Sequence, residues 1–271
     1  MKLLLRTWIM TAPLAAQWLH YPTPGVPRTP NGEINYEAPA PRTPDGKPDF
    51  TGIWSPNSAP PVGTGKTWGT TGGGRLRSVF VDIGWGLAGG APYQPWAAEL
   101  THKRQAREGI DGPETRCEPL FLLTRMAAPS PKKFVQLPGL LLVLWERNME
   151  FRQIFTDGRP LPEDPNPSWQ GYSAGKWDGD TLVVESIGFK DGLWADGFGS
   201  PVTDATKVTE RFRRLTYGQM SVEVTVDDPK AYTRPWTVKL TYDNWPDTDL
   251  LEQYLCENEK DVKHMPVGAA Q

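Results

Sequence analysis

The amino-acid sequence predicts a mainly β protein whose strands form an antiparallel barrel. Three observations lead to this fold class. From Phe134 onward, short segments alternate apolar and polar residues, as half-buried strands do. Turn residues separate these segments at short, regular intervals, and no helical pattern lies between them. Strands that follow one another in this way pair as an antiparallel sheet, most simply a barrel or a sandwich.

The strands are expected, in chain order, in residues 133–158, 175–189, 207–228, 234–245 and 249–258. The first segment holds two or three strands, since a Pro-Gly pair at 138–139 and Asn148 are turn residues. An Asp-Gly pair at 178–179 is the expected tight turn of a hairpin, and a Tyr-Gly pair at 217–218 joins the next two strands.

The alternation within the later strands assigns their faces. Met220, Val222 and Val224 fall on one face, and the charged and hydroxyl side chains between them fall on the other. The same pattern continues from Trp236 to Tyr242. One dry face and one wet face are what an up-and-down barrel requires, so we prefer the barrel to the sandwich.

The chain before these strands divides into three parts. Residues 1–16 have the charge, apolar run and small residues of a secretory signal. Residues 17–49 form a proline-rich N-terminal strap, in which PRTPNGEINY at 27–36 is echoed by PRTPDGKPDF at 41–50. Residues 50–271 are then a single barrel domain, with one helix at 95–109 that begins at a proline and ends at a glycine.

The GTGKT stretch at 63–67 is similar to the end of a phosphate-binding P-loop. A P-loop needs a glycine where Pro60 stands, a strand before it and a helix behind it. The prolines before GTGKT exclude a buried strand, and the glycines that follow it disfavour a helix. We therefore expect no nucleotide site.

Composition excludes several partners and suggests a compartment. The net charge is -3, from 29 basic and 32 acidic residues without a basic run, so no nucleic acid is expected. No segment approaches the roughly 18 apolar residues of a membrane span. Cys117 and Cys256, the two cysteines, are expected to form one disulfide in a periplasmic or secreted protein. No cofactor or metal is expected, since neither cysteine has a second ligand at metal-binding spacing.

Two stretches are similar to lipocalin-like, or calycin, domains. Phe50-Thr51-Gly52-Ile53-Trp54 resembles the Gly-x-Trp signature that opens the first barrel strand of lipocalins. GKWDGDTLVV at 175–184 resembles a hairpin of these domains. The resemblance implies a lipocalin-like β-barrel.

Over most of its length the chain also resembles a large family of uncharacterised exported bacterial proteins. The segments that carry the resemblance are PDFTGIW at 48–54, FRQIFTDGRPLPED at 151–164, GYSAGKWDGDTLVVE at 171–185, VTERFRR at 208–214, DDPKAYTRPWTV at 227–238 and PDTDLLEQYLCENEKD at 246–261. The resemblance implies export and brings no assigned activity. Ser200-Pro201-Val202 departs from it, because a stretch like His-Pro-His is expected there, and this puts any histidine-based role in doubt.

Glu210 is the main candidate for chemistry. It alternates with Val208 and Phe212 and so points toward the apolar face. A carboxylate there can act as a general acid or base, with Arg152 or Tyr232 stabilising developing charge. The alternative is structural, namely an internal ion pair between Glu210 and an arginine, either Arg152 or Arg214.

Aromatic residues in the strands and loops suggest a ligand site. Flat rings beside carboxylates suit a sugar or a phenolic molecule, although a self-packed plug of loops is the alternative. The candidate ligand-binding residues are Trp54, Trp169, Tyr172, Trp177, Trp194 and Trp236.

Three functions remain open from the sequence. The first is an exported protein that binds a small apolar or aromatic molecule in its barrel. The second is a lyase, isomerase or hydrolase that uses Glu210, and the third is a structural or interaction protein that docks a partner through its strap. Whether the protein is an enzyme, and its oligomeric state, are not determined by the sequence.

Overall fold

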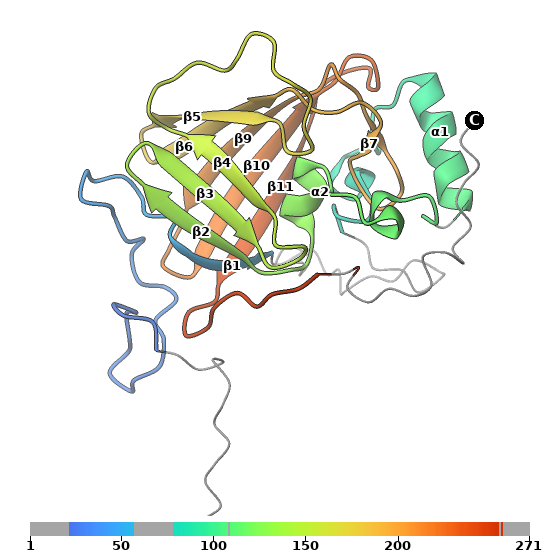
Figure 1. The fold of residues 1–271 in the computed structure, drawn as a ribbon. Helices are drawn as coiled ribbons and strands as arrows, with labels where there is room; N and C mark the ends of the chain where they lie inside the picture. Colours follow the sequence, from blue (N-terminus) through green and yellow to red (C-terminus); the bar gives the residue numbers. More distant parts are fainter. Residues whose placement is uncertain (1–21, 57–77, 108, 255, 257–271) are drawn as a thin grey trace, which may run out of the picture.

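The computed structural model describes residues 22–56, 78–107, 109–254 and 256, so the expected signal segment 1–16 and the GTGKT stretch lie outside it. Nine strands close into a barrel in the order β1-β11-β10-β9-β6-β5-β4-β3-β2 (Figure 1). The mainly β barrel is therefore confirmed. The strands are β1 (Gly52–Pro56), β2 (Lys132–Leu137), β3 (Leu140–Trp145), β4 (Phe151–Phe155), β5 (Tyr172–Asp178), β6 (Thr181–Ile187), β9 (Lys207–Arg214), β10 (Gln219–Asp227) and β11 (Trp236–Asn244).

One pair in the barrel is parallel, so the sheet is mixed and the purely antiparallel prediction is wrong at this seam. β4 and β5 pair in parallel through Ile154 with Ser173 and Phe155 with Ala174. The connection that allows this is the long loop 156–171, which returns the chain to the end at which β4 began (Figure 1). Parallel neighbours need a crossover of about this length, whereas a hairpin does not.

Two other predictions about the strands need correction. Asp178 pairs with Thr181, so the tight turn is Gly179-Asp180 and not Asp178-Gly179. The prediction of a strand at 249–258 is also wrong. The described residues there form only an isolated bridge, from Gln253 to the β3–β4 turn. β1 already pairs with both β11 and β2, which leaves no free edge for a further strand.

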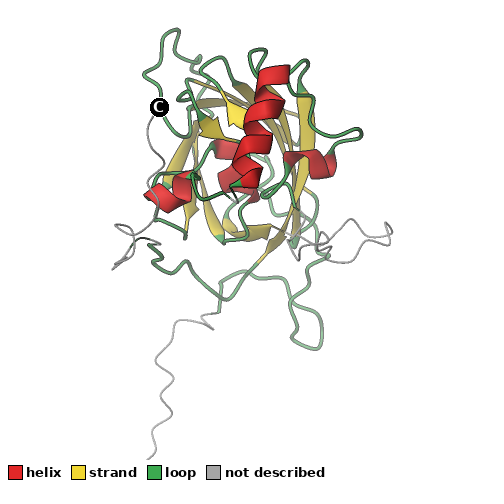
Figure 2. Ribbon diagram, turned by 90° about the vertical axis from the view of Figure 1, so that its right-hand side faces the viewer, coloured by secondary structure: helices red, strands yellow, loops and turns green. Residues whose placement is uncertain are grey.

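Helices cover one end of the barrel (Figure 2). The expected helix is α1 (Pro95–Ala106), which begins as predicted and ends three residues early. The sequence did not predict α2 (Leu122–Ala127), whose six residues are all buried. Two short 3-10 helices, η1 (Ile83–Gly86) and η2 (Pro113–Arg116), and a two-stranded ribbon of β7 (Leu193–Trp194) and β8 (Pro201–Val202) complete this end.

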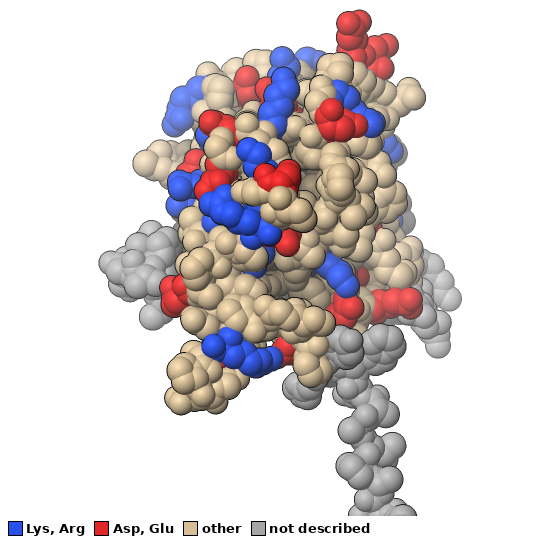
Figure 3. All heavy atoms as spheres, turned by 90° about the vertical axis from the view of Figure 1, so that its left-hand side faces the viewer, with Lys and Arg blue, Asp and Glu red and all other residues tan. Residues whose placement is uncertain are grey.

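Large side chains pack inside the barrel as the alternation predicts. Met220, Val222 and Val224 are buried, as are Trp236 and Tyr242 on β11. The outer surface that faces left in Figure 1 carries Lys and Arg interspersed with Asp and Glu (Figure 3). No helix among the described residues is long and apolar enough to cross a membrane.

The two sequence repeats of the strap fold into the same loop. In the first, the Thr29 amide donates to the Glu33 carbonyl at 2.8 Å, and in the second Thr43 donates to Lys47 at 2.8 Å. Each loop turns at a glycine of positive φ, which is 83° at Gly46. One arginine per repeat then binds a carboxylate elsewhere in the chain: Arg28 binds Asp247, which follows β11, and Arg42 binds Asp180 in the β5–β6 turn.

Candidate functional site

Glu210 and Arg152 meet inside the barrel. Both are fully buried, and the Arg152 guanidinium spans both Glu210 carboxylate oxygens, with Nη1 donating to Oε1 at 3.0 Å and Nη2 to Oε2. Arg152 Nε also donates to Ser173 Oγ at 3.1 Å, and Nη2 to Ser186 Oγ at 3.0 Å. The partner of Glu210 is therefore Arg152. Arg214 instead donates to backbone carbonyls of the strap and the β9–β10 turn.

This polar network crosses the weakest seam of the barrel. Its four residues come from β4, β5, β6 and β9, in that order around the sheet. Backbone pairing between β4 and β5 covers only two residue pairs, and Arg152 precedes both of them. Every nitrogen of the guanidinium donates within this network, and both carboxylate oxygens of Glu210 accept from it. The geometry therefore supports the structural interpretation of Glu210.

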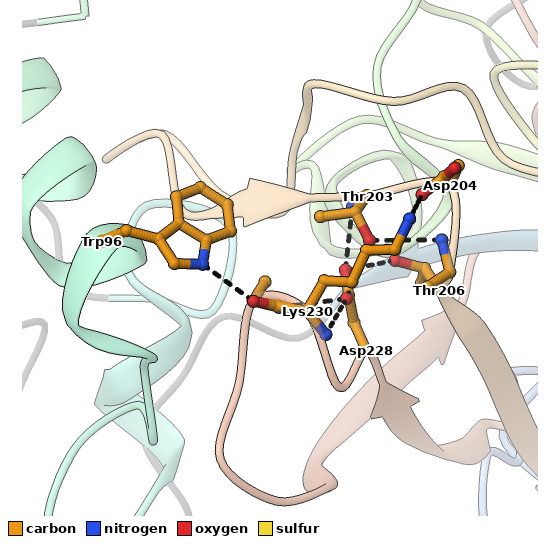
Figure 4. A network of polar contacts seen from close by, with 8 residues as sticks. Trp96, Thr203, Asp204, Thr206, Asp228 and Lys230 are labelled. Carbon is orange, nitrogen blue, oxygen red and sulfur yellow. Dashed lines mark hydrogen bonds and ion pairs between the residues drawn. The ribbon is translucent and has the colours of Figure 1, made fainter.

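Tyr232 lies in the β10–β11 turn, and the structure does not join it to Glu210. Its hydroxyl donates to the Pro201 carbonyl at 3.0 Å, and burial raises the pKa of this phenol. The carboxylate of Asp228 holds the turn by accepting from Thr203 Oγ1 at 2.9 Å and Thr206 Oγ1 at 2.7 Å (Figure 4). Tyr232 is thus positioned by a network that links the turn to the β8–β9 loop.

A second buried carboxylate, Asp196, organises the loop between β7 and β8. Its Oδ2 accepts from the Ile83 amide at 2.8 Å and from Ser200 Oγ at 2.7 Å, and Oδ1 accepts from the Ser200 amide at 3.0 Å. Tyr93 and Ser200 share a further hydroxyl hydrogen bond of 2.6 Å. Burial raises the pKa of Asp196 to about 6. These bonds occupy the carboxylate, so it holds η1 and the loop together.

The six aromatic candidates have separate packing partners and do not gather at one mouth. Tyr172 is 39% exposed on β5. The other five pack as follows: Trp54 under the Arg214 guanidinium, Trp169 under the Lys190 ammonium, Trp177 stacked on Phe50, Trp194 under the Arg104 guanidinium, and Trp236 against the edge of Tyr232. Most of these rings are already covered by the protein's own side chains.

A cluster of incompletely bonded polar groups lies between α2 and the barrel. Arg125 on α2 is 0% exposed and forms an ion pair with Glu150 through Nη2. Its Nε and Nη1 have no hydrogen-bond partner among the described residues. The same holds, within that part of the chain, for the indole Nε1 of Trp145 and for Ser130 Oγ. Buried polar groups without partners are rare, so this cluster is the most unusual polar feature of the interior.

Lys132 carries a second cation into the same region. It is 0% exposed at the start of β2, and Nζ donates to the Met126 carbonyl at 3.1 Å and the Ala128 carbonyl at 3.4 Å. Burial lowers the pKa of Lys132 well below its ordinary value, and the nearby positive charge of Arg125 lowers it further. Burial also lowers the pKa of Arg125 and raises that of Glu150.

The sequence singled out neither Arg125 nor Lys132. Arg125 stands alone in the apolar run FLLTRMAA, and a single cation in such a run is the signal that marks it. Lys132 begins a strand that alternates cleanly only from Phe134. Their significance depends on the fold, which buries both side chains in the same region.

The expected disulfide between Cys117 and Cys256 is confirmed, with the Cα atoms 6.0 Å apart. It joins the end of η2 to the segment after β11, and not to a last strand as predicted. Among the described residues, no group of three His, Cys, Asp or Glu side chains is placed to hold a metal ion.

Comparisons with family models, with curated proteins and with solved structures find no match for this chain.

Proposed function

We propose that the protein binds a small apolar or aromatic molecule that carries an acidic group, with the acid held by Arg125. The single observation behind this proposal is the fully buried guanidinium whose Nε and Nη1 lack partners in the described chain. A buried donor without a partner costs about 1–3 kcal/mol, and more when it is charged. A carboxylate bound through two parallel hydrogen bonds is the ligand that fits a guanidinium best.

The surroundings of Arg125 fit the rest of such a ligand. The Trp145 indole N–H has no partner within the described structure, and Tyr242 lies close by, since its hydroxyl donates to the Met126 carbonyl at 3.0 Å. Glu150, whose side chain is 16% exposed, marks where the cluster reaches the surface. Mostly apolar walls with a few polar groups are typical of small-molecule sites.

The proposed setting is the periplasm or the exterior of the cell. The disulfide supports it, because such bonds persist in oxidising compartments. The resemblance of the sequence to exported bacterial proteins with a lipocalin-like barrel points the same way.

The two alternative functions receive less support. An acid–base role for Glu210 is less favoured, because Arg152 donates to both of its carboxylate oxygens within a buried network. A strap that docks a partner would use its exposed arginines, yet Arg28 and Arg42 form ion pairs with Asp247 and Asp180 of the same chain.

Thermal unfolding in the presence of benzoate tests the proposal. Benzoate is expected to raise the Tm of the native protein, and benzamide, which has the same shape without the charge, is not. Arg125→Met and Arg125→Lys should both lose the shift, since neither keeps the planar fork. The matched control is Arg213→Met on the outer face of β9, which should keep it.

Either of two results would overturn the proposal: an equal shift in the Arg125 variants, or no shift by benzoate and larger aromatic acids in the native protein. The Arg125→Lys variant guards against misfolding, because it retains the positive charge beside Glu150. Native mass spectrometry of the protein from its own host then identifies a co-purifying acid.

A further inference from the structure

Lys132 is buried and has no counter-ion among the residues that the structure describes, which distinguishes it from the lysine beside it. Its ammonium nitrogen contacts two backbone carbonyls and the face of Tyr242, whose ring centroid is 5.1 Å away. Lys133, the next residue, points outward and forms an ion pair with Asp249 at 2.8 Å. An isolated ammonium is costly to bury, so the neutral amine is favoured at Lys132.

The sheet places this amine beside the proposed acid site. Lys132 is the register partner of Trp145, so their side chains are neighbours on the inner face. Arg125 approaches closely enough for its charge to act on Lys132. A buried lysine amine, a guanidinium with two nitrogens that lack partners among the described residues, and two aromatic rings therefore lie together beneath α2.

We propose that Lys132 is an amine nucleophile that forms an imine with a small aromatic oxo acid whose carboxylate is bound by Arg125. This inference rests on the proposed function and names the substrate class of that site. Lysines in dry, cationic surroundings are the ones that form such bonds.

The reaction needs no oxidant or further reactant. The lone pair of Nζ attacks the carbonyl carbon, and the C–O π electrons move to oxygen, which takes up a proton to give a carbinolamine. The nitrogen gives up one proton at this stage. The hydroxyl then takes up a second proton and leaves as water while the nitrogen lone pair forms the C=N bond, and loss of the remaining N–H proton gives the neutral imine. Hydrolysis in the reverse direction returns the free lysine and the oxo acid.

A structural role for Lys132 is the competing explanation. Met126 and Ala128 lie at the C-terminal end of α2, where a cation is stabilised by the exposed carbonyls and the helix dipole. A lysine with that role alone would act as an ammonium and would not react with carbonyl compounds. Reactivity therefore separates the two roles, whereas stability measurements do not.

The experiment is to incubate the native protein with phenylpyruvate and cyanoborohydride and to locate the reduced adduct by peptide mass spectrometry. We expect one adduct, on Lys132, formed many times faster than on any exposed lysine. Lys132→Arg should abolish it and Lys133→Arg should leave it unchanged. Benzoate should protect Lys132 in the native protein, a measurement that needs no variant.

Absence of an adduct on Lys132, or labelling no faster than that of Lys133, would overturn the inference. The result is distinguishable from a failure of the proposed function. If benzoate raises the Tm through Arg125 but no adduct forms, the acid site stands and Lys132 is only a helix cap. If an adduct forms on Lys132 equally in Arg125→Lys, Arg125 does not hold the acid, and the inference as stated is wrong.

Discussion

Arg152 and Glu210 each depend on the other for charge compensation inside the barrel. Removing one partner leaves a buried charge unpaired, so Arg152→Met and Glu210→Met should each lower the free energy of unfolding by about 3–5 kcal/mol. The double variant replaces the pair with apolar side chains and should lose much less than the sum. Urea unfolding of the four proteins measures this coupling as a double-mutant cycle.

An exposed ion pair between β9 and β5 on the outside of the barrel provides the control for this cycle. Arg211 on β9 binds Asp178 at 3.1 Å, and both side chains are largely in solvent. Substituting them singly and together should be additive within about 0.5 kcal/mol. Additive losses at Arg152 and Glu210 as well would contradict the structural role assigned to the buried pair.

At the scale of elements, the alternation of apolar and polar residues predicts the barrel strands wherever one face of the strand is exposed to solvent. Glu210 could be placed inward because its neighbours Val208 and Phe212 fix the phase of β9. The sequence did not predict α2, because this helix is buried on all sides and has no exposed polar face. A short apolar run does not distinguish a helix from a strand. The cluster at Arg125 was missed for the same reason, since it exists only where α2 meets β2 and β3.

Two features depend on long-range pairing: the parallel seam, and the lack of a last strand in the described part of 249–258. Nothing in the local pattern of 249–258 shows that β1 pairs with the edge of β11 at which a last strand would otherwise pair. Likewise, the sequence of 156–171 indicates a loop, but it does not show whether β5 pairs with β4 in parallel or antiparallel. The alternation of residues predicts which segments are strands. The order in which the strands close the barrel depends instead on which strand edges are available for pairing.

The repeated loops of the strap depend on a backbone conformation that few residues adopt. Gly46 has φ of +83°, and nothing lies within 4 Å of an added Cβ, so only the dihedral angle limits substitution. Gly46→Val should open the second loop and raise amide exchange in residues 41–49 by about tenfold. Gly46→Asn should remain near the native rate, because asparagine tolerates this region.

Hydrogen exchange followed by mass spectrometry measures this difference peptide by peptide. The first loop, residues 27–35, is the internal control, because it has the same hydrogen bonds and keeps Gly32. Equal exchange of the second loop in all three proteins would show that φ at Gly46 does not limit the fold of the strap.

At the scale of the whole molecule, the disulfide closes a loop of just over half of the chain. Cys117 and Cys256 are 139 residues apart, and the segment before Cys256 packs on the β3–β4 turn through a hydrogen bond from the Asn148 amide to the Gln253 carbonyl. A loop of this length restricts the unfolded chain strongly. Cys117→Ser/Cys256→Ser should therefore lower the free energy of unfolding by about 2–5 kcal/mol in urea.

The single variants test whether this effect belongs to the bond. Each one breaks the same disulfide, so Cys117→Ser, Cys256→Ser and the double variant should lose similar amounts, far from additive. Exchange should rise first at Asn148, whereas the β9, β10 and β11 amides should stay protected, because the barrel closes without the bonded segment. Native stability in the double variant would mean that strand pairing alone holds the C-terminal segment, and it would remove the disulfide as an argument for an oxidising compartment.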